Sequence, residues 1–121
     1  MPRENLLNNR IRGIGFAFKG AWLLIKTESS IQIQMVIAVI MTIAGFLFDL
    51  SIIEWILQIL AISLVLGVEG INTAVEKMSD FVHPDFNEKI GFIKDVSAGA
   101  VMFVSIGATI IGLLIYLPKI I

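Results

Sequence analysis

Three long apolar stretches dominate the sequence, and few charged residues interrupt them. They cover about residues 31–48, 52–71 and 96–117. A helix needs roughly 20 residues to cross the 30 Å hydrocarbon core of a bilayer. The pattern therefore predicts an all-α membrane protein with three transmembrane helices, built as a single domain over residues 1–121. Only Asp49, Leu50 and Ser51 separate the first two stretches, so we expect these two helices to form an antiparallel hairpin.

Residues 1–28, which precede the first span, show a different periodicity. Apolar residues recur there at helical spacing, at Leu7, Ile11, Ile14, Phe18, Trp22 and Ile25, while Arg12, Lys19 and Lys26 repeat every seventh position on another face. This pattern predicts an amphipathic interfacial helix that lies on the membrane surface with its cations near anionic headgroups. A soluble amphipathic helix packed against protein would show the same pattern.

The basic residues indicate the orientation of the spans. Five of them, Arg3, Arg10, Arg12, Lys19 and Lys26, precede the first span, and Lys77, Lys89 and Lys94 lie between the second and the third. Only Lys119 lies elsewhere. Because positive charge collects on the cytoplasmic side, we expect the N-terminus and residues 77–95 to be cytoplasmic.

The composition excludes several kinds of site. The formal net charge is −1, whereas nucleic-acid binding requires a basic excess, so we expect no nucleic-acid partner. The chain has no cysteine and one histidine, which rules out a thiolate nucleophile and a histidine or cysteine metal cluster. The hydrophobic content of 57% is typical of a chain that has the bilayer as its solvent.

One polar stripe stands out on the continuation of the second span. Glu69, Asn72, Glu76 and Asp80 fall on one face of a helix, with Glu69 at the membrane boundary and Glu76 and Asp80 beyond it. A solvated acidic helix end would give the same spacing. An amide among carboxylates favours a second interpretation, a site for polyphosphate and magnesium.

The spacing along this stripe indicates that its two glutamates have different roles. Glu69 and Glu76 are roughly 10 Å apart along the helix axis, too far to bind one ion together. One of them can hold a metal on a nucleotide while the other, nearer the lipid, accepts the proton of an attacking hydroxyl group.

Lys94 and Asp95 open the third span. If a helix begins there, Lys94 shares a face with the small residues Ala98, Ser105, Ala108, Thr109 and Gly112. Small residues allow transmembrane helices to approach closely, so we expect Lys94 to point into the bundle. It either neutralises phosphate or reaches to the membrane surface as a structural lysine. The chain contains no Gly-x-x-x-x-Gly-Lys-Ser/Thr loop, which excludes that soluble nucleotide-binding motif.

The segment from Glu69 to Asp80, Glu-Gly-Ile-Asn-Thr-Ala-Val-Glu-Lys-Met-Ser-Asp, closely resembles the signature of the prokaryotic diacylglycerol kinase family, which includes undecaprenol kinases. Ile93-Lys94-Asp95 resembles the second marker of this family at the expected distance. The resemblance extends over nearly the whole chain, from Phe16-Ala-Phe-Lys-Gly20 and Glu28 through three spans in order.

This resemblance implies a homotrimeric enzyme of the bacterial inner membrane, with composite active sites between subunits, that uses magnesium and ATP. The catalytic base of the family matches Glu69, its metal ligands match Glu28 and Glu76, and its other nucleotide contacts match Asn72, Asp80, Lys94 and Asp95. Departures from the family pattern occur at Gln32 and Gln34 and over residues 85–89, and the arginine that contacts the nucleotide matches either Arg10 or Arg12.

The function expected from the sequence is ATP-dependent phosphorylation of a membrane lipid hydroxyl group. Diacylglycerol converted to phosphatidic acid is the first hypothesis, and undecaprenol is the alternative lipid. A third hypothesis, from another class, is a non-catalytic membrane assembly protein or a small ion conductor. A conductor requires polar residues through the whole bilayer, whereas residues 52–67 contain only Glu54, Gln58 and Ser63 as polar residues.

Overall fold

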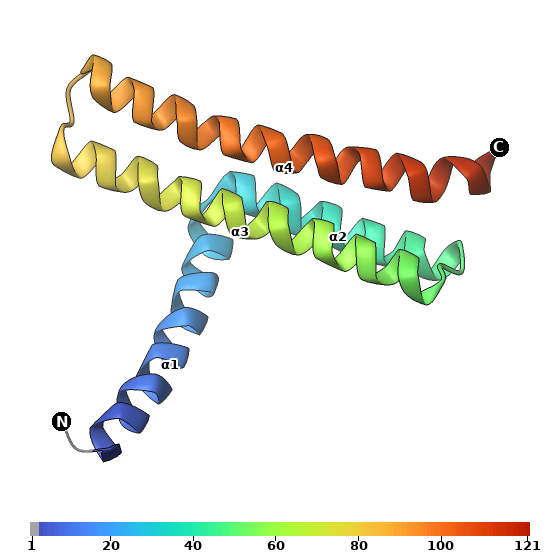
Figure 1. Ribbon diagram of the computed structural model, residues 1–121, viewed down its shortest axis with the longest axis horizontal. Coiled ribbons are helices and arrows are strands. Elements are labelled where there is room, and N and C mark those ends of the chain that lie inside the picture. Colours follow the sequence, from blue (N-terminus) through green and yellow to red (C-terminus); the bar gives the residue numbers. More distant parts are fainter. Residues whose placement is uncertain (1–2) are drawn as a thin grey trace.

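The computed structural model describes residues 3–121 and consists of four helices joined by short connections. These are α1 (Arg3–Thr27), α2 (Ser29–Leu47), α3 (Ile52–Val82) and α4 (Glu88–Ile120). The helices α2, α3 and α4 lie side by side, and α1 runs crosswise to them from the start of α2 (Figure 1). Each of the three is long and apolar enough to cross a membrane. The prediction of an all-α membrane protein with an N-terminal helix and three spanning helices is confirmed.

The helices α3 and α4 extend well past the membrane lengths expected from hydropathy. α3 continues to Val82 without a break, so Glu69, Asn72, Glu76 and Asp80 share one helix as predicted. α4 begins at Glu88, earlier than the expected start near Lys94. The reason is a local cap: Asn87 Oδ1 accepts hydrogen bonds from the backbone N–H groups of Lys89, at 2.9 Å, and Ile90, at 3.4 Å.

A tight turn joins α2 to α3, as expected from the short polar interruption. Ser51 Oγ accepts a hydrogen bond from Glu54 N, and Glu54 Oε1 accepts one from Ser51 N, which together form a capping box. Asp49 adopts a φ of 54°, in the left-handed region that Asp tolerates better than most residues. We call this end of the bundle, where the C-terminus also lies, the turn end (Figure 1).

Polar contacts inside apolar surroundings tie the three long helices together near the turn end. Gln58 on α3 is 5% exposed, and its Nε2 donates to the backbone carbonyl of Met41 on α2 at 2.9 Å. The Tyr116 hydroxyl of α4 donates to Gln58 Oε1 at 2.6 Å and lies 3.2 Å from the same carbonyl. Lys119 and Glu54 add an ion pair at 2.7 Å. Such contacts fix the register of helices where the hydrophobic effect between them is weak.

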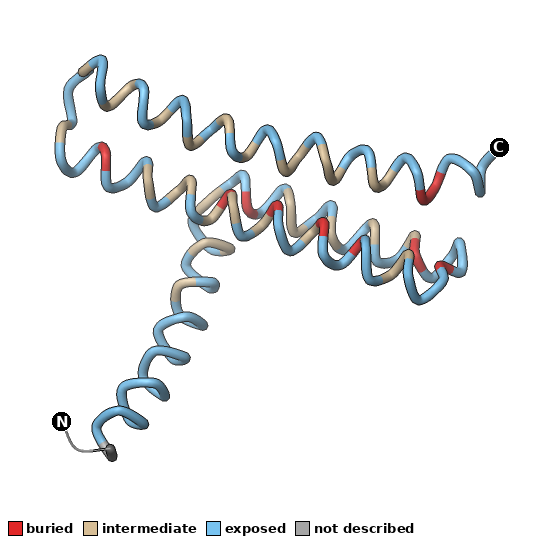
Figure 2. Tube along the Cα trace, in the orientation of Figure 1, coloured by how far each residue is buried: buried red, intermediate tan, exposed pale blue. Residues whose placement is uncertain are grey.

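Among the described residues, the buried ones lie on α2, α3 and α4 and at Leu50 in the turn between α2 and α3, while α1 is exposed along most of its length (Figure 2). Large apolar side chains cover the outer faces of all three long helices. In a bilayer these faces contact lipid or other subunits instead of water.

Gly45 allows α2 and α3 to approach closely at the turn end. The Trp55 ring lies over Gly45, and a Cβ atom there would lie 2.8 Å from Cζ2 and 2.9 Å from Cζ3. Because Trp55 would have to move, we expect Gly45→Ala to lower the free energy of unfolding by about 1–3 kcal/mol. Thermal unfolding in detergent micelles measures this loss. Gly67→Ala is the control, since a Cβ at Gly67 would have no atom of the described residues within 4 Å beyond its own helix backbone and chain neighbours. Equal melting temperatures for both variants would contradict the prediction.

Candidate active site

The most buried carboxyl group of the polar stripe is that of Glu69, which is 7% exposed. Gln34 on α2 donates a hydrogen bond from Nε2 to Glu69 Oε1 at 3.1 Å. Within the part of the chain that the structure describes, the buried atoms Glu69 Oε2 and Asn72 Oδ1 have no hydrogen-bond partner. Unpaired buried oxygens are costly, so these two atoms mark a place where a ligand would supply the missing donors or a cation.

Glu28 lies at the bend between α1 and α2, at the N-cap position of α2, where its backbone is extended and its side chain makes no capping hydrogen bond. The Nε2 atom of Gln32 donates to the carbonyls of Ile25 and Lys26, at 3.0 and 3.2 Å, and so satisfies two carbonyl groups in the last turn of α1. The same bend packs on α3: a Cβ at Gly70 would lie 3.0 Å from Leu24 Cδ1. This packing places Glu28 beside the polar part of α3.

Glu28 contacts a lysine next to Glu76. Lys77 Nζ lies 3.5 Å from Glu28 Oε1, and the lysine side chain is 74% exposed. The contact is therefore a loose surface ion pair of little energetic value. Glu76 itself is exposed, with no ion pair to the side chains that the structure describes, those of residues 5–121. The structure thus brings Glu28 to the segment of α3 that carries Glu76.

Lys94 on α4 pairs with Asp80 on α3. Its Nζ lies 2.6 Å from Asp80 Oδ1, and both side chains remain partly exposed. The prediction that Lys94 turns toward the bundle agrees with this contact, although its partner was not anticipated. Asp95, the next residue along α4, is exposed. The nucleotide-binding candidates therefore lie on α3 and α4. They are Asn72 and Asp80 on the part of α3 that follows Glu69, and Lys94 and Asp95 on α4.

The carboxylates fit a magnesium ion only if other ligands accompany it. Among the residues that the structure describes, no three His, Cys, Asp or Glu side chains gather closely enough to hold a metal ion. Magnesium commonly binds one or two carboxylates together with substrate phosphates and water. Glu28 and Glu76 are the candidates for such a pair, since both carry hard oxygen atoms and neither is held in a tight ion pair by the residues that the structure describes.

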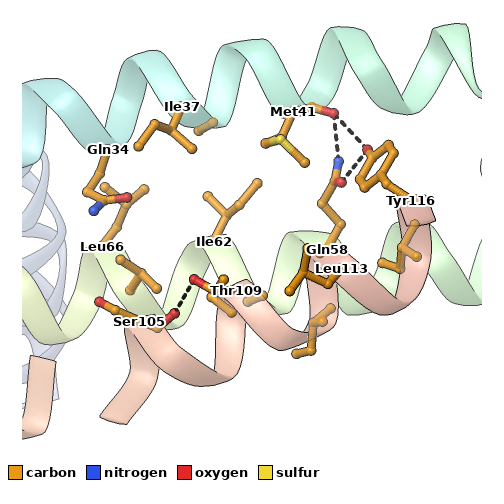
Figure 3. Close-up of a pocket in the computed structure, with 17 residues that line it drawn as sticks. Gln34, Ile37, Met41, Gln58, Ile62, Leu66, Ser105, Thr109, Leu113 and Tyr116 are labelled. Carbon is orange, nitrogen blue, oxygen red and sulfur yellow. Dashed lines mark hydrogen bonds between the residues drawn. The ribbon is translucent and has the colours of Figure 1, made fainter. Parts of the chain in front are cut away.

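A groove of about 450 Å³ runs between α2, α3 and α4 within the apolar part of the bundle (Figure 3). Gln34 lies at one end of the groove, and Gln58 and Tyr116 lie at the other (Figure 3). Most of its remaining lining is apolar, with Ser105 and Thr109 of α4 as small polar exceptions. Sequence reasoning did not predict this groove, because its walls come from three helices whose register depends on packing.

Fold and site together define a small multi-pass membrane protein with a buried carboxyl group beside an apolar groove. A model of the prokaryotic diacylglycerol kinase family matches residues 15–116. The chain is 37% identical over 116 residues to an undecaprenol kinase of Bacillus subtilis (strain 168), covering 96% of this chain and 94% of that protein. It is 28% identical over 103 residues to a diacylglycerol kinase of Escherichia coli (strain K12), covering 83% and 82%.

The chain belongs to the prokaryotic diacylglycerol kinase family. The resemblance drawn from the segments at Glu69–Asp80 and Lys94–Asp95 is confirmed, as is the expectation of a lipid kinase. This membership supports an enzyme rather than an assembly protein or an ion conductor. The roles of individual residues remain predictions.

Proposed function

We propose that the protein transfers the terminal phosphate of ATP to the hydroxyl group of a membrane lipid. The observation that carries this proposal is the buried carboxyl group of Glu69, whose Oε2 has no partner among the described residues and whose Oε1 is hydrogen-bonded to Gln34 at one end of an apolar groove. A lipid alcohol has the matching chemistry, because its chain stays in apolar surroundings while its hydroxyl group donates to a carboxylate.

In this proposal Glu69 is the general base. Its Oε2 accepts the proton of the lipid hydroxyl group while the oxygen attacks the γ-phosphorus and ADP leaves with the bridging oxygen. Glu28 and Glu76 would hold magnesium, which neutralises charge on the phosphates. Asn72, Asp80, Lys94 and Asp95 would bind the nucleotide, with Asp80 keeping the Lys94 ammonium group at the site until phosphate arrives.

Two lipids are candidates for the acceptor. Diacylglycerol was the first expectation from the sequence, and its product is phosphatidic acid. The higher identity and coverage of the undecaprenol kinase relative favour undecaprenol as the first lipid to test. Transfer from radiolabelled ATP to each lipid, offered side by side to the purified protein, tests the function and its substrate. Absence of a labelled product with both lipids would refute the proposal.

The proposed setting is the bacterial inner membrane, with α1 on its cytoplasmic surface and three subunits in each oligomer. The crosswise direction of α1 suits a helix that lies in the membrane plane while α2, α3 and α4 cross it (Figure 1). The broad apolar faces left exposed on the single chain suit contacts with lipid and with other subunits.

The orientation is tested by labelling single cysteines. Ile52 at the turn end and Asp85 between α3 and α4 are exposed and cap no helix, so cysteine is tolerable at both positions. We expect a membrane-impermeant thiol reagent to label Ile52→Cys in intact cells and Asp85→Cys only after the cells are opened, because of the basic residues near Asp85. Labelling of both positions from outside would contradict the orientation.

A further inference from the structure

Gln34 lies where the candidate base and the groove meet. Its Nε2 donates to Glu69 Oε1 at 3.1 Å, and the same side chain lines one end of the groove (Figure 3). The other carboxyl oxygen of Glu69 has no partner among the described residues. The two oxygens of the Glu69 carboxyl group therefore differ in their hydrogen bonding: Gln34 holds Oε1, and Oε2 is left to accept a proton.

A general base acts well only when its accepting oxygen is held within hydrogen-bond reach of the proton. A glutamate side chain has several rotatable bonds, and a single donor to one oxygen reduces the set of orientations available to the other. A neutral amide does this without bringing a cation to the carboxylate. A lysine or arginine in the same place would form an ion pair and weaken Glu69 as a base.

We propose that Gln34 is a positioning residue that orients Glu69 for proton transfer. The inference rests on the proposed function, in which Glu69 Oε2 accepts the proton of the lipid hydroxyl group. In that step the lipid oxygen forms a bond to the γ-phosphorus, the bond from phosphorus to the bridging oxygen of ADP breaks, and the proton moves to Oε2. The Gln34 amide keeps its own protons and holds Oε1 throughout.

Two substitutions at position 34 test this role. Gln34→Leu keeps a similar volume and removes the donor, so we expect kcat to fall about 10-fold or more while the KM for magnesium-ATP stays within about twofold. Gln34→Glu keeps the length and places a second carboxyl group against Glu69. An ionised carboxylate has no hydrogen to donate to Glu69 Oε1, so kcat should fall at least as far as in Gln34→Leu.

A double-mutant cycle with Glu69→Gln separates positioning from a general effect on the fold. If Gln34 acts through Glu69, adding Gln34→Leu to Glu69→Gln should lower the residual kcat by less than about twofold. The same 10-fold fall in both backgrounds would overturn the proposal. A kcat of Gln34→Leu within twofold of the parent would also overturn it.

Gln58→Leu provides the structural comparison, because Gln58 is a second glutamine that lines the same groove, and its amide donates to a backbone carbonyl instead of to Glu69. We expect this variant to lower the melting temperature more than Gln34→Leu does. If Gln34→Leu loses activity only in proportion to its folded fraction, position 34 is structural and the proposal fails. Lipid phosphorylation by the parent, and its loss in Glu69→Gln, are measured in the same series, so a failure of the proposed function is recognised separately.

Discussion

Replacing Glu69 by glutamine is expected to lower turnover by about 100-fold or more, because a positioned general base contributes typically 10²–10⁴ to the rate. The substitution preserves shape, and the new side chain retains an oxygen that accepts the hydrogen bond from Gln34 Nε2. The variant should therefore fold, insert into the membrane and bind magnesium-ATP as the parent does. A loss confined to kcat would locate the role of Glu69 in the chemical step.

Single-turnover transfer of labelled phosphate, with nucleotide binding measured separately, provides the test. Glu54→Gln is the matched control, because Glu54 is a carboxylate in the first turn of the same helix, at the turn end, and pairs with Lys119. Turnover in Glu54→Gln should stay within a few-fold of the parent. Survival of turnover in Glu69→Gln would remove Glu69 as the base. Lys94 pairs with Asp80, so Glu69 does not serve as the ion-pair partner of that lysine.

The helices themselves could be predicted because long apolar runs have few alternatives in a bilayer. Their ends could not be read from hydropathy alone. The start of α4 at Glu88 depends on a cap by Asn87, and the extension of α3 to Val82 crosses polar sequence where hydropathy is low. Attention to the Asn-Glu-Lys run at residues 87–89 would have indicated that helix start.

The polar stripe of the site could also be predicted, since it depends on the spacing of residues along one helix. The partners across helices could not. Gln34 contacts Glu69, and Lys77 contacts Glu28. Both contacts depend on the axial register of neighbouring helices. This register is fixed by close contacts such as Trp55 on Gly45, which no periodicity reveals.

The second large effect is expected from substitutions of Glu28 and Glu76, the two carboxylates proposed to hold magnesium. Removing one carboxylate from a site with only two protein ligands should raise the magnesium concentration for half-maximal rate by about 10–100-fold. We expect this in both Glu28→Gln and Glu76→Gln, with much of the maximal rate recovered at high magnesium. Magnesium titrations at fixed free ATP measure the shift. Glu88→Gln, a change at an exposed carboxylate in the first turn of α4, should leave the titration unchanged.

Lys77 distinguishes a ligand role of Glu28 from a structural one. Its contact with Glu28 is loose and exposed, so the lysine should move away when a divalent cation arrives. Lys77→Gln should then leave the magnesium requirement within about twofold of the parent, while Glu28→Gln raises it strongly. Equal effects of the two substitutions would mean that Glu28 acts through the ion pair, and unchanged titrations in both Glu28→Gln and Glu76→Gln would exclude these carboxylates as ligands. Because the two residues come from different helices, a shift in both variants would also show that the bend between α1 and α2 belongs to the active site.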